Sequence, residues 1–249
     1  MTPSTHLLRP LRLSLAVVVF GLSALPFWVG IYLVLPSLAR RGASTALALS
    51  AGLLIPLALL LAAAVASARR QSIGRGVAGL RGRLRVEKLR WKDAGWAAAL
   101  LAVTLGGYFG LRGTAVWFQT HVGLVPPPEL DLVQTGRSFW GIELAGNWWA
   151  VLLHVGILVL NVAGEELWFR GVLFPRQEAA HGTRAWLVHG LCYHGFHMFF
   201  PWDVLRLLPE SIMYGWVAQR SRSTWPGILS HFVFNGLGLI ATISGVLAT

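Results

Sequence analysis

Long apolar blocks, separated by short polar segments, are the feature that most constrains the fold of this chain. Each block is close to twenty residues long, which is the length of helix that crosses the ~30 Å hydrocarbon core of a bilayer. We therefore expect an all-α fold, a polytopic transmembrane helical bundle of about seven spans. The clearest blocks are Leu13–Leu35, Thr45–Ala68, Ala94–Leu111, Trp148–Leu173, Ala185–Phe200 and Trp225–Leu247. A weaker block, Val204–Val217, is interrupted by Arg206, Pro209 and Glu210, and we interpret Pro209 and Glu210 as a break in this span.

Composition agrees with a membrane protein. Of the 249 residues 55% are hydrophobic and 12% are charged, about half the charged fraction of a typical soluble domain. The first apolar run, Leu13–Leu35, is longer than the apolar region of a signal peptide, so we expect it to remain as an uncleaved span. The single cysteine, Cys192, excludes an internal disulfide and a cysteine-rich metal site.

The basic residues have a clustered distribution. The net charge is +11, and nine of the 21 Lys and Arg residues fall within Arg69–Lys92, between two apolar blocks. Basic residues beside membrane spans are what the positive-inside rule predicts, and they also attract anionic lipid. We therefore expect the 69–92 loop to contact the lipid surface, and we expect no nucleic acid partner.

The same rule predicts the orientation of the chain. If the 69–92 loop is cytoplasmic, the N-terminal Arg9 and Arg12 are cytoplasmic too, and the Arg112–Asn147 loop is external. We expect two parts: residues 1–93, with two spans and the basic loop, and residues 94–249, with the functional site. The sequence does not indicate the oligomeric state.

Ionisable residues inside an apolar helix are the first functional signal. A charged side chain at mid-membrane costs roughly 2.5–3.5 kcal/mol on insertion scales, so residues that remain there are functional candidates. Glu165, Glu166 and Arg170 lie within the Trp148–Leu173 block. Glu166 and Arg170 are four residues apart and can form an ion pair on one helix face. Glu165 points about 100° away, which leaves its carboxylate available for chemistry.

Polar residues in the later blocks complete the candidate site. Tyr193 and His197 lie in one block, and His231 and Asn235 lie four residues apart in the last. The Arg176–Arg184 and Gln219–Thr224 loops are cytoplasmic in the same orientation. At ~1.5 Å per residue, Glu165 lies about 16 Å from Arg176, His197 about 20 Å from Arg184 and His231 about 13 Å from Arg222. Their similar depths predict one water-filled cavity that opens toward the cytoplasm.

Several classes of intramembrane hydrolase lack their required residues here. A zincin-like protease needs the H-E-x-x-H spacing, which does not occur. An aspartyl type needs two intramembrane Asp residues, but Asp93, Asp131 and Asp203 all fall at span edges or in loops. A rhomboid-like enzyme needs a serine in a Gly-x-Ser-Gly-type setting, and none is present. A set of Glu, His, His and Asn remains.

These motifs resemble the CPBP family, which contains the CAAX-prenyl endopeptidases and their bacterial relatives. That family carries Glu-Glu-x-x-x-Arg, Phe-x-x-x-His and His-x-x-x-Asn on successive late helices. The matching residues here are Glu165, Glu166 and Arg170, then Tyr193 and His197, then His231 and Asn235. Tyr193 stands where Phe is usual, and we interpret it as a packing position. The resemblance extends over roughly residues 94–247 and implies a CAAX-protease-like bundle in a bacterial inner membrane.

The resemblance also implies a mechanism. Glu165 would deprotonate a water that His197 helps to position, and His231 and Asn235 would donate hydrogen bonds to the oxyanion. Glu166 and Arg170 would support this helix. We expect no cofactor, although Glu165, His197 and His231 would also make a legitimate catalytic Zn²⁺ set.

Alternative functions and substrates stay open at this stage. The cavity could instead belong to a scaffold or chaperone that binds a hydrophobic peptide, or to a proton-coupled transporter with Glu165 and His197 as a relay. The transporter is disfavoured by the lack of visible repeats and the few spans. For a protease, the membrane-associated substrate could be a prenylated C-terminal peptide, a leader peptide or a C-terminal sorting tail.

Overall fold

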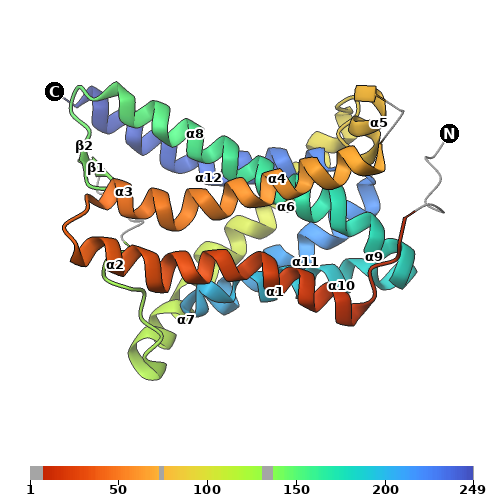
Figure 1. The fold of residues 1–249 in the computed structure, drawn as a ribbon, viewed down its shortest axis with the longest axis horizontal. Coiled ribbons are helices and arrows are strands. Elements are labelled where there is room, and N and C mark those ends of the chain that lie inside the picture. The colour runs from red at the N-terminus through yellow and green to blue at the C-terminus, as the bar shows by residue number, and fades with distance from the viewer. Residues whose placement is uncertain (1–7, 73–75, 131–136, 249) are drawn as a thin grey trace.

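Helices form nearly all of the regular structure in the computed structural model, which describes residues 8–72, 76–130 and 137–248 (Figure 1). The predicted all-α class is confirmed. Within these residues the only strands form a short antiparallel hairpin, β1 (Ser138–Phe139) and β2 (Ile142–Glu143). Asp131, which was assigned to the external loop, lies outside the described residues.

The N-terminal part is a long helical hairpin followed by a short helix. Its elements are α1 (Leu13–Val29), the π-helical η2 (Gly30–Val34), α2 (Leu35–Arg40), α3 (Thr45–Leu49), the π-helical η3 (Ser50–Leu54), α4 (Ile55–Gln71) and α5 (Gly76–Arg83). The two arms cross closely where η2 meets η3, because a Cβ on Gly30 would lie 2.0 Å from the carbonyl oxygen of Gly52. Only glycine fits at this crossing.

The remaining elements carry the candidate residues. They are α6 (Trp91–Gly110), α7 (Arg112–Trp117), the π-helical η4 (Phe118–Val122), α8 (Trp148–Glu165), the π-helical η5 (Glu166–Leu173), α9 (Phe174–His181), the 3₁₀ turn η6 (Gly182–Arg184), α10 (Ala185–Phe196), the 3₁₀ turns η7 (His197–Phe199) and η8 (Pro201–Asp203), α11 (Val204–Ser221) and α12 (Trp225–Leu247).

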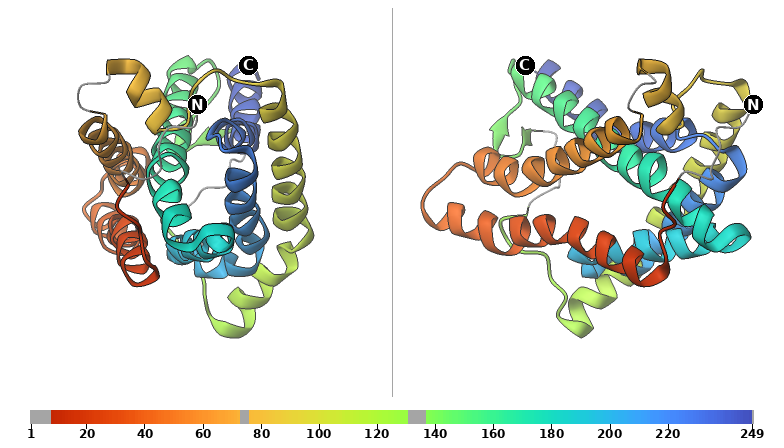
Figure 2. Two further views of the ribbon diagram at one scale, coloured as in Figure 1. Left: turned by 90° about the vertical axis from the view of Figure 1, so that its right-hand side faces the viewer. Right: turned by 45° about the vertical axis from the view of Figure 1, so that its right-hand side comes forward.

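The site helices lie in the middle of the bundle. Helices α8, α10, α11 and α12 are placed between the α1–α4 hairpin on one side and α6 on the other (Figure 2). Helix α1 packs on α10, α4 packs on α8 and η5, and α6 contacts both α11 and α12. Segments far apart in sequence are thereby brought around one interior.

Four helical stretches among the described residues are long and apolar enough to cross a membrane: Leu13–Arg40, Thr45–Gln71, Trp148–Phe199 and Trp225–Leu247. A fifth is added if Trp91–Gly110 and Arg112–Val122, bent by 40°, form one span. Residues Trp148–Phe199 contain two of the predicted spans, and the weak block Val204–Val217 does not qualify separately. The chain is an integral membrane protein, and the predicted count of seven spans is not confirmed.

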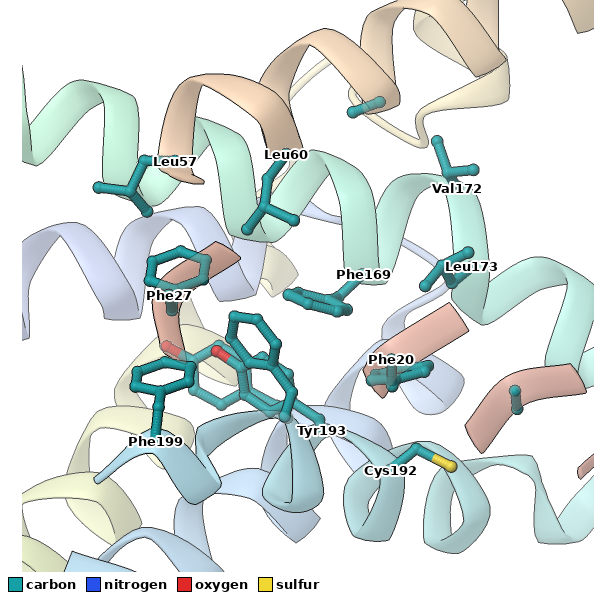
Figure 3. Close-up of a cluster of buried hydrophobic side chains, with 14 of the residues drawn as sticks. Phe20, Phe27, Leu57, Leu60, Phe169, Val172, Leu173, Cys192, Tyr193 and Phe199 are labelled. Atoms are coloured by element: carbon teal, nitrogen blue, oxygen red, sulfur yellow. The ribbon is translucent and has the colours of Figure 1, made fainter. Parts of the chain in front are cut away.

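The hydrophobic core joins the two predicted parts of the chain. Phe20, Phe27, Leu57 and Leu60 from α1 and α4 pack with Phe169, Tyr193 and Phe199 from the later helices (Figure 3). The outer face of α1 exposes large apolar side chains, as expected for a lipid-facing helix, including Leu13, Leu15, Val17, Val18, Leu22 and Leu25. The division at residue 93 therefore does not separate two cores.

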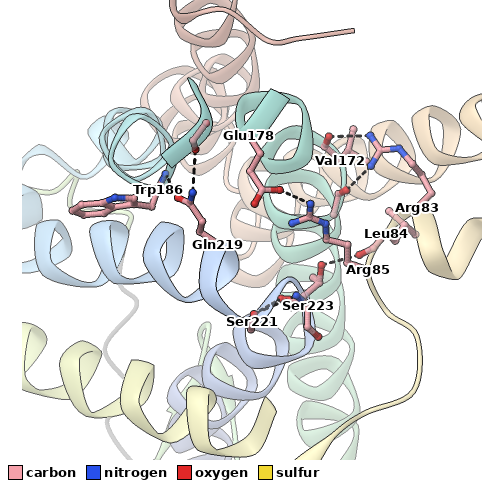
Figure 4. A network of polar contacts seen from close by, with 12 residues as sticks. Arg83, Leu84, Arg85, Val172, Glu178, Trp186, Gln219, Ser221 and Ser223 are labelled. Carbon is pink, nitrogen blue, oxygen red and sulfur yellow. Dashed lines mark hydrogen bonds and ion pairs between the residues drawn. The ribbon is translucent and has the colours of Figure 1, made fainter. Parts of the chain in front are cut away.

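The segment 83–90, which we call the basic strap, lies across the end of η5 (Figure 4). The Arg83 guanidinium donates to the carbonyls of Gly171 (3.0 Å) and Val172 (3.1 Å), and Arg85 pairs with Glu178. The carbonyl of Leu84 accepts from the Thr224 hydroxyl at 2.7 Å. These contacts correct part of the lipid prediction: Arg83 and Arg85 bind protein.

Other basic residues of the 69–92 segment remain exposed. Among the described residues they are Arg69, Arg70, Arg81, Lys88, Arg90 and Lys92, of which Arg90 pairs with Asp93. Contact between this segment and anionic lipid stays a prediction that now concerns these residues.

Candidate active site

Glu165 is the last residue of α8, and its carboxylate points toward α10. The Tyr193 hydroxyl donates a 2.6 Å hydrogen bond to its Oε2 atom, and the His197 Nε2 atom lies 3.8 Å from the same oxygen. His197 Nδ1 is 3.0 Å from the backbone carbonyl of Tyr193, which orients the ring. Glu165 is only 7% exposed. The Glu165 carboxylate and the His197 imidazole, 32 residues apart in sequence, thus face each other.

The next eight residues form a π-helix rather than the regular α-helix that the sequence predicts. Such segments are rare and are often found at functional sites. Neighbouring backbone packs closely against both ends of η5. Just before η5, a Cβ added to Gly164 would lie 2.9 Å from the carbonyl oxygen of Leu57. Near its end, a Cβ added to Gly171 would lie 3.2 Å from the carbonyl oxygen of Leu84. The widened turn is therefore packed between α4 and the basic strap.

Glu166 is fully buried and links two helices. Its Oε1 atom lies 3.3 Å from Arg170 Nη1, which confirms the predicted ion pair. The same oxygen lies 3.0 Å from His231 Nδ1 on α12, a contact that the sequence did not predict. Its Oε2 atom lies against Gly227, where an added Cβ would approach to 2.1 Å. A glycine one turn before His231 therefore makes room for this carboxylate.

Arg170 is held by two aromatic rings as well as by Glu166. Its guanidinium carbon lies 3.8 Å from the centroid of the Tyr193 ring and 4.0 Å from that of Tyr214. Cations over aromatic faces are stabilised by the ring quadrupole, most strongly where water is excluded. The buried charge of Arg170 is thus compensated, which supports the structural role expected for it.

A cavity of about 360 Å³ lies at the centre of these helices. All four residues predicted to be catalytic line it: Glu165, His197, His231 and Asn235. Glu166 and Arg170 lie behind this surface. Much of the wall is apolar, with contributions from Phe27, Leu53, Leu57, Ile157, Leu207 and Phe234.

The cavity also contains polar residues that the sequence analysis missed. Asn161 lies one helical turn before Glu165 on α8, and Glu210 lies one turn before Tyr214 on α11. Glu210 was interpreted only as part of a break in a weak span, but it lies in a continuous helix and lines the cavity. Asn161 lies four residues before Glu165, and Glu210 lies four residues before Tyr214. This spacing puts each on the same helix face as a residue of the cavity, and it is the sequence signal that could have identified them.

The interpretation of Tyr193 as a packing position is wrong in one respect. Its ring does pack, in contact with Phe169 and Phe196, but its hydroxyl contacts the carboxylate of Glu165. A tyrosine hydroxyl can donate where phenylalanine cannot. The tyrosine at this position therefore adds a hydrogen bond to Glu165 that the phenylalanine usual in the motif could not make.

The alternative zinc set does not fit this geometry. Within the described part of the chain, no three His, Cys, Asp or Glu side chains are placed to hold one metal ion. The expectation that no cofactor is needed remains a prediction.

Comparison with known families supports the motif analysis. Residues 147–237 match the profile of the family described as type II CAAX prenyl endopeptidase Rce1-like. The matched stretch begins just before α8 and ends within α12, so it contains all three motifs. It confirms that this stretch resembles the CAAX-prenyl endopeptidases. No curated relative and no solved structure matches the chain.

Proposed function

Because residues 147–237 match the type II CAAX prenyl endopeptidase Rce1-like family, we propose that the protein is an intramembrane endopeptidase with Glu165 as its general base. The observation that carries this proposal is the placement of the Glu165 carboxylate beside His197 in a cavity with largely apolar walls. The substrate is a membrane-associated peptide.

The chemistry begins with a water held between Glu165 and His197. Glu165 takes one proton as the water oxygen attacks the peptide carbonyl carbon, which forms a tetrahedral oxyanion. The C–N bond then breaks, and the proton passes from Glu165 to the leaving amine nitrogen. The products are a new carboxylate and a new amine, and the carboxylate of Glu165 is regenerated.

His231 and Asn235 supply the hydrogen bonds that stabilise the oxyanion. Since the ionised Glu166 carboxylate can only accept, His231 Nδ1 donates to it, which leaves Nε2 for the cavity. Nε2 would donate to the oxyanion when the ring carries its second proton. The amide of Asn235 lines the same cavity one turn further along α12. Removing one such donor typically lowers kcat by about 10²–10³-fold.

The orientation in the membrane completes the proposal. The end of the bundle that carries the exposed basic residues of the 69–92 segment would face the cytoplasm, with the protein in a bacterial inner membrane. The cavity lining includes Tyr108 and Trp140 and no described residue of that segment, so it gives no support to the predicted cytoplasmic opening. Prenylated C-terminal peptides, leader peptides and C-terminal sorting tails all remain candidate substrates.

Reconstituted protein tests this proposal. Wild type, His197→Ala and His231→Ala would be placed in lipid vesicles with peptides of these three classes, and fragments would be identified by mass spectrometry. We expect wild type to cleave one class and each variant to lose at least about 10²-fold in kcat/KM. His194→Ala, a change on α10 outside the cavity lining, is the matched control and should retain activity. Binding of a peptide without cleavage would instead support the scaffold function.

A further inference from the structure

The hydroxyl of Tyr193 is the closest polar partner of Glu165 among the described residues. Tyr193 lies on α10, one turn before His197, and is 2% exposed. Its hydroxyl hydrogen bond to Glu165 Oε2, at 2.6 Å, is short, as expected for an O–H donor on an ionised oxygen. The partner of this phenol is therefore the reacting carboxylate itself.

The ring of Tyr193 is fixed from several sides. The Arg170 guanidinium lies over one face, and the Phe169 ring contacts it edge to face at 5.0 Å between centroids. The ring of His197 is 4.6 Å away at 89°. A side chain held in this way presents its hydroxyl at a defined point, so the oxygen it contacts is also defined.

The two oxygens of Glu165 are consequently not equivalent. Oε2 accepts from Tyr193 and lies near His197, whereas Oε1 accepts no hydrogen bond from the described protein. A free carboxylate rotates about its terminal torsion in a broad energy well. The hydrogen bond from Tyr193 restricts that rotation and leaves Oε1 free for a water.

We propose that Tyr193 is a positioning residue that fixes the Glu165 carboxylate so that Oε1 meets the attacking water. This inference rests on the proposed function of Glu165. Phenylalanine, which is usual at this place in the motif, would keep the ring contacts but would not orient the carboxylate. The hydroxyl is therefore an addition made by this chain to the site.

The test is the Tyr193→Phe variant, which removes only the hydroxyl and retains the stacking on Arg170. We expect kcat to fall about 10- to 100-fold, the range for loss of a hydrogen bond to a charged group, while KM stays within about twofold. Tyr32→Phe is the matched control, because it removes a phenol hydrogen bond to the Phe199 carbonyl and Tyr32 does not line the cavity. It should leave both constants unchanged.

Two further variants separate positioning from packing. Para-aminophenylalanine at position 193 retains a donor at the ring tip, so it should recover part of kcat even if Tyr193→Phe is poorly folded. In a Glu165→Asp background, which keeps a carboxylate but withdraws it from the Tyr193 hydroxyl, Tyr193→Phe should cause a smaller additional loss than in wild type, because its effect acts through Glu165.

The outcomes distinguish this inference from the proposed function. If Glu165→Gln is inactive and Tyr193→Phe retains wild-type kcat, the role of Tyr193 is overturned while the protease proposal stands. An equal loss of kcat in Tyr193→Phe and Tyr32→Phe, or no recovery with the amino analogue, would also overturn it. If Glu165→Gln cleaves at the wild-type rate, both proposals fail.

Discussion

The carboxylate of Glu166 and the imidazole of His231 meet at 3.0 Å between Oε1 and Nδ1, although the residues are 65 positions apart. The same oxygen lies 3.3 Å from Arg170. One buried carboxylate therefore joins the π-helix η5 to α12 and orients a ring that faces the cavity. The adjacent glutamates have separate roles: Glu166 supports the site and Glu165 faces it.

Replacing Glu166 with Gln should destabilise the protein. The change leaves Arg170 as a buried charge without its counter-ion, and breaking such a pair typically costs about 3–5 kcal/mol. We expect a lower unfolding temperature in detergent, measured by tryptophan fluorescence. Glu178→Gln breaks the more exposed pair with Arg85 and should cost about 1 kcal/mol or less. Equal unfolding temperatures for the two variants would contradict the assigned role of Glu166.

A methyl group at position 227 should displace the Glu166 carboxylate. In Gly227→Ala the new Cβ would lie 2.1 Å from Glu166 Oε2, so the carboxylate must move away from His231. We expect cleavage to fall at least tenfold and the unfolding temperature to drop. Gly236→Ala, on the same helix, meets only the Leu158 side chain at 3.8 Å, an ordinary contact, and should keep its stability. Wild-type cleavage and unfolding temperature in Gly227→Ala would show that Glu166 is not held against Gly227.

Arg83 should hold the end of η5 in place. Arg83→Met removes the donors to the carbonyls of Gly171 and Val172, so amide hydrogen exchange should accelerate within 166–173. The exposed Arg81→Met, from the same helix, is the control and should leave exchange there unchanged. An unchanged exchange rate in Arg83→Met would contradict a role for the strap in ordering η5.

The contacts of Arg83 should not vary with pH in the neutral range. Burial, together with the charges of Arg85 and Arg176, lowers the pKa of Arg83 to about 10, so the side chain stays charged at neutral pH. Because the unfolded chain holds this proton more tightly, the contribution of Arg83 to stability should be constant below about pH 10 and increase above it. Amide exchange rates of residues 166–173, corrected for the intrinsic effect of pH on exchange, should therefore be the same at pH 6 and pH 8. If the wild-type rates differ between the two pH values and Arg83→Met abolishes that difference, this prediction is contradicted.

Glu210 should contribute to substrate binding more than to catalysis. It lines the cavity but makes no hydrogen bond to Glu165, His197 or His231 in the described structure. Glu210→Gln should therefore raise KM several-fold, most for substrates with a basic residue near the cleaved bond, with a smaller change in kcat. Glu143→Gln, on the exposed β2 strand, serves as the control. A loss confined to kcat would assign Glu210 to the chemistry instead.

Local spacing predicted the parts of the site that depend on one helix. The four-residue separation of Glu166 and Arg170 predicted their ion pair, and apolar block lengths predicted most helices. Contacts between helices were harder to foresee. The hydroxyl of Tyr193 reaches Glu165 only because α8 and α10 pack in a particular register, and the π-helical turn at Glu166 depends on neighbouring backbone. Glu210 was missed because Pro209 suggested a break, whereas α11 continues through it.

The cleavage rate of Glu165→Gln, in lipid vesicles with the substrate identified for wild type, tests the central claim most directly. Glutamine keeps the size of the side chain but cannot accept a proton from water. We predict that this variant folds and inserts like wild type, binds the substrate and releases no detectable fragment in a single-turnover assay. Release of the same fragments at the wild-type rate would contradict Glu165 as the general base.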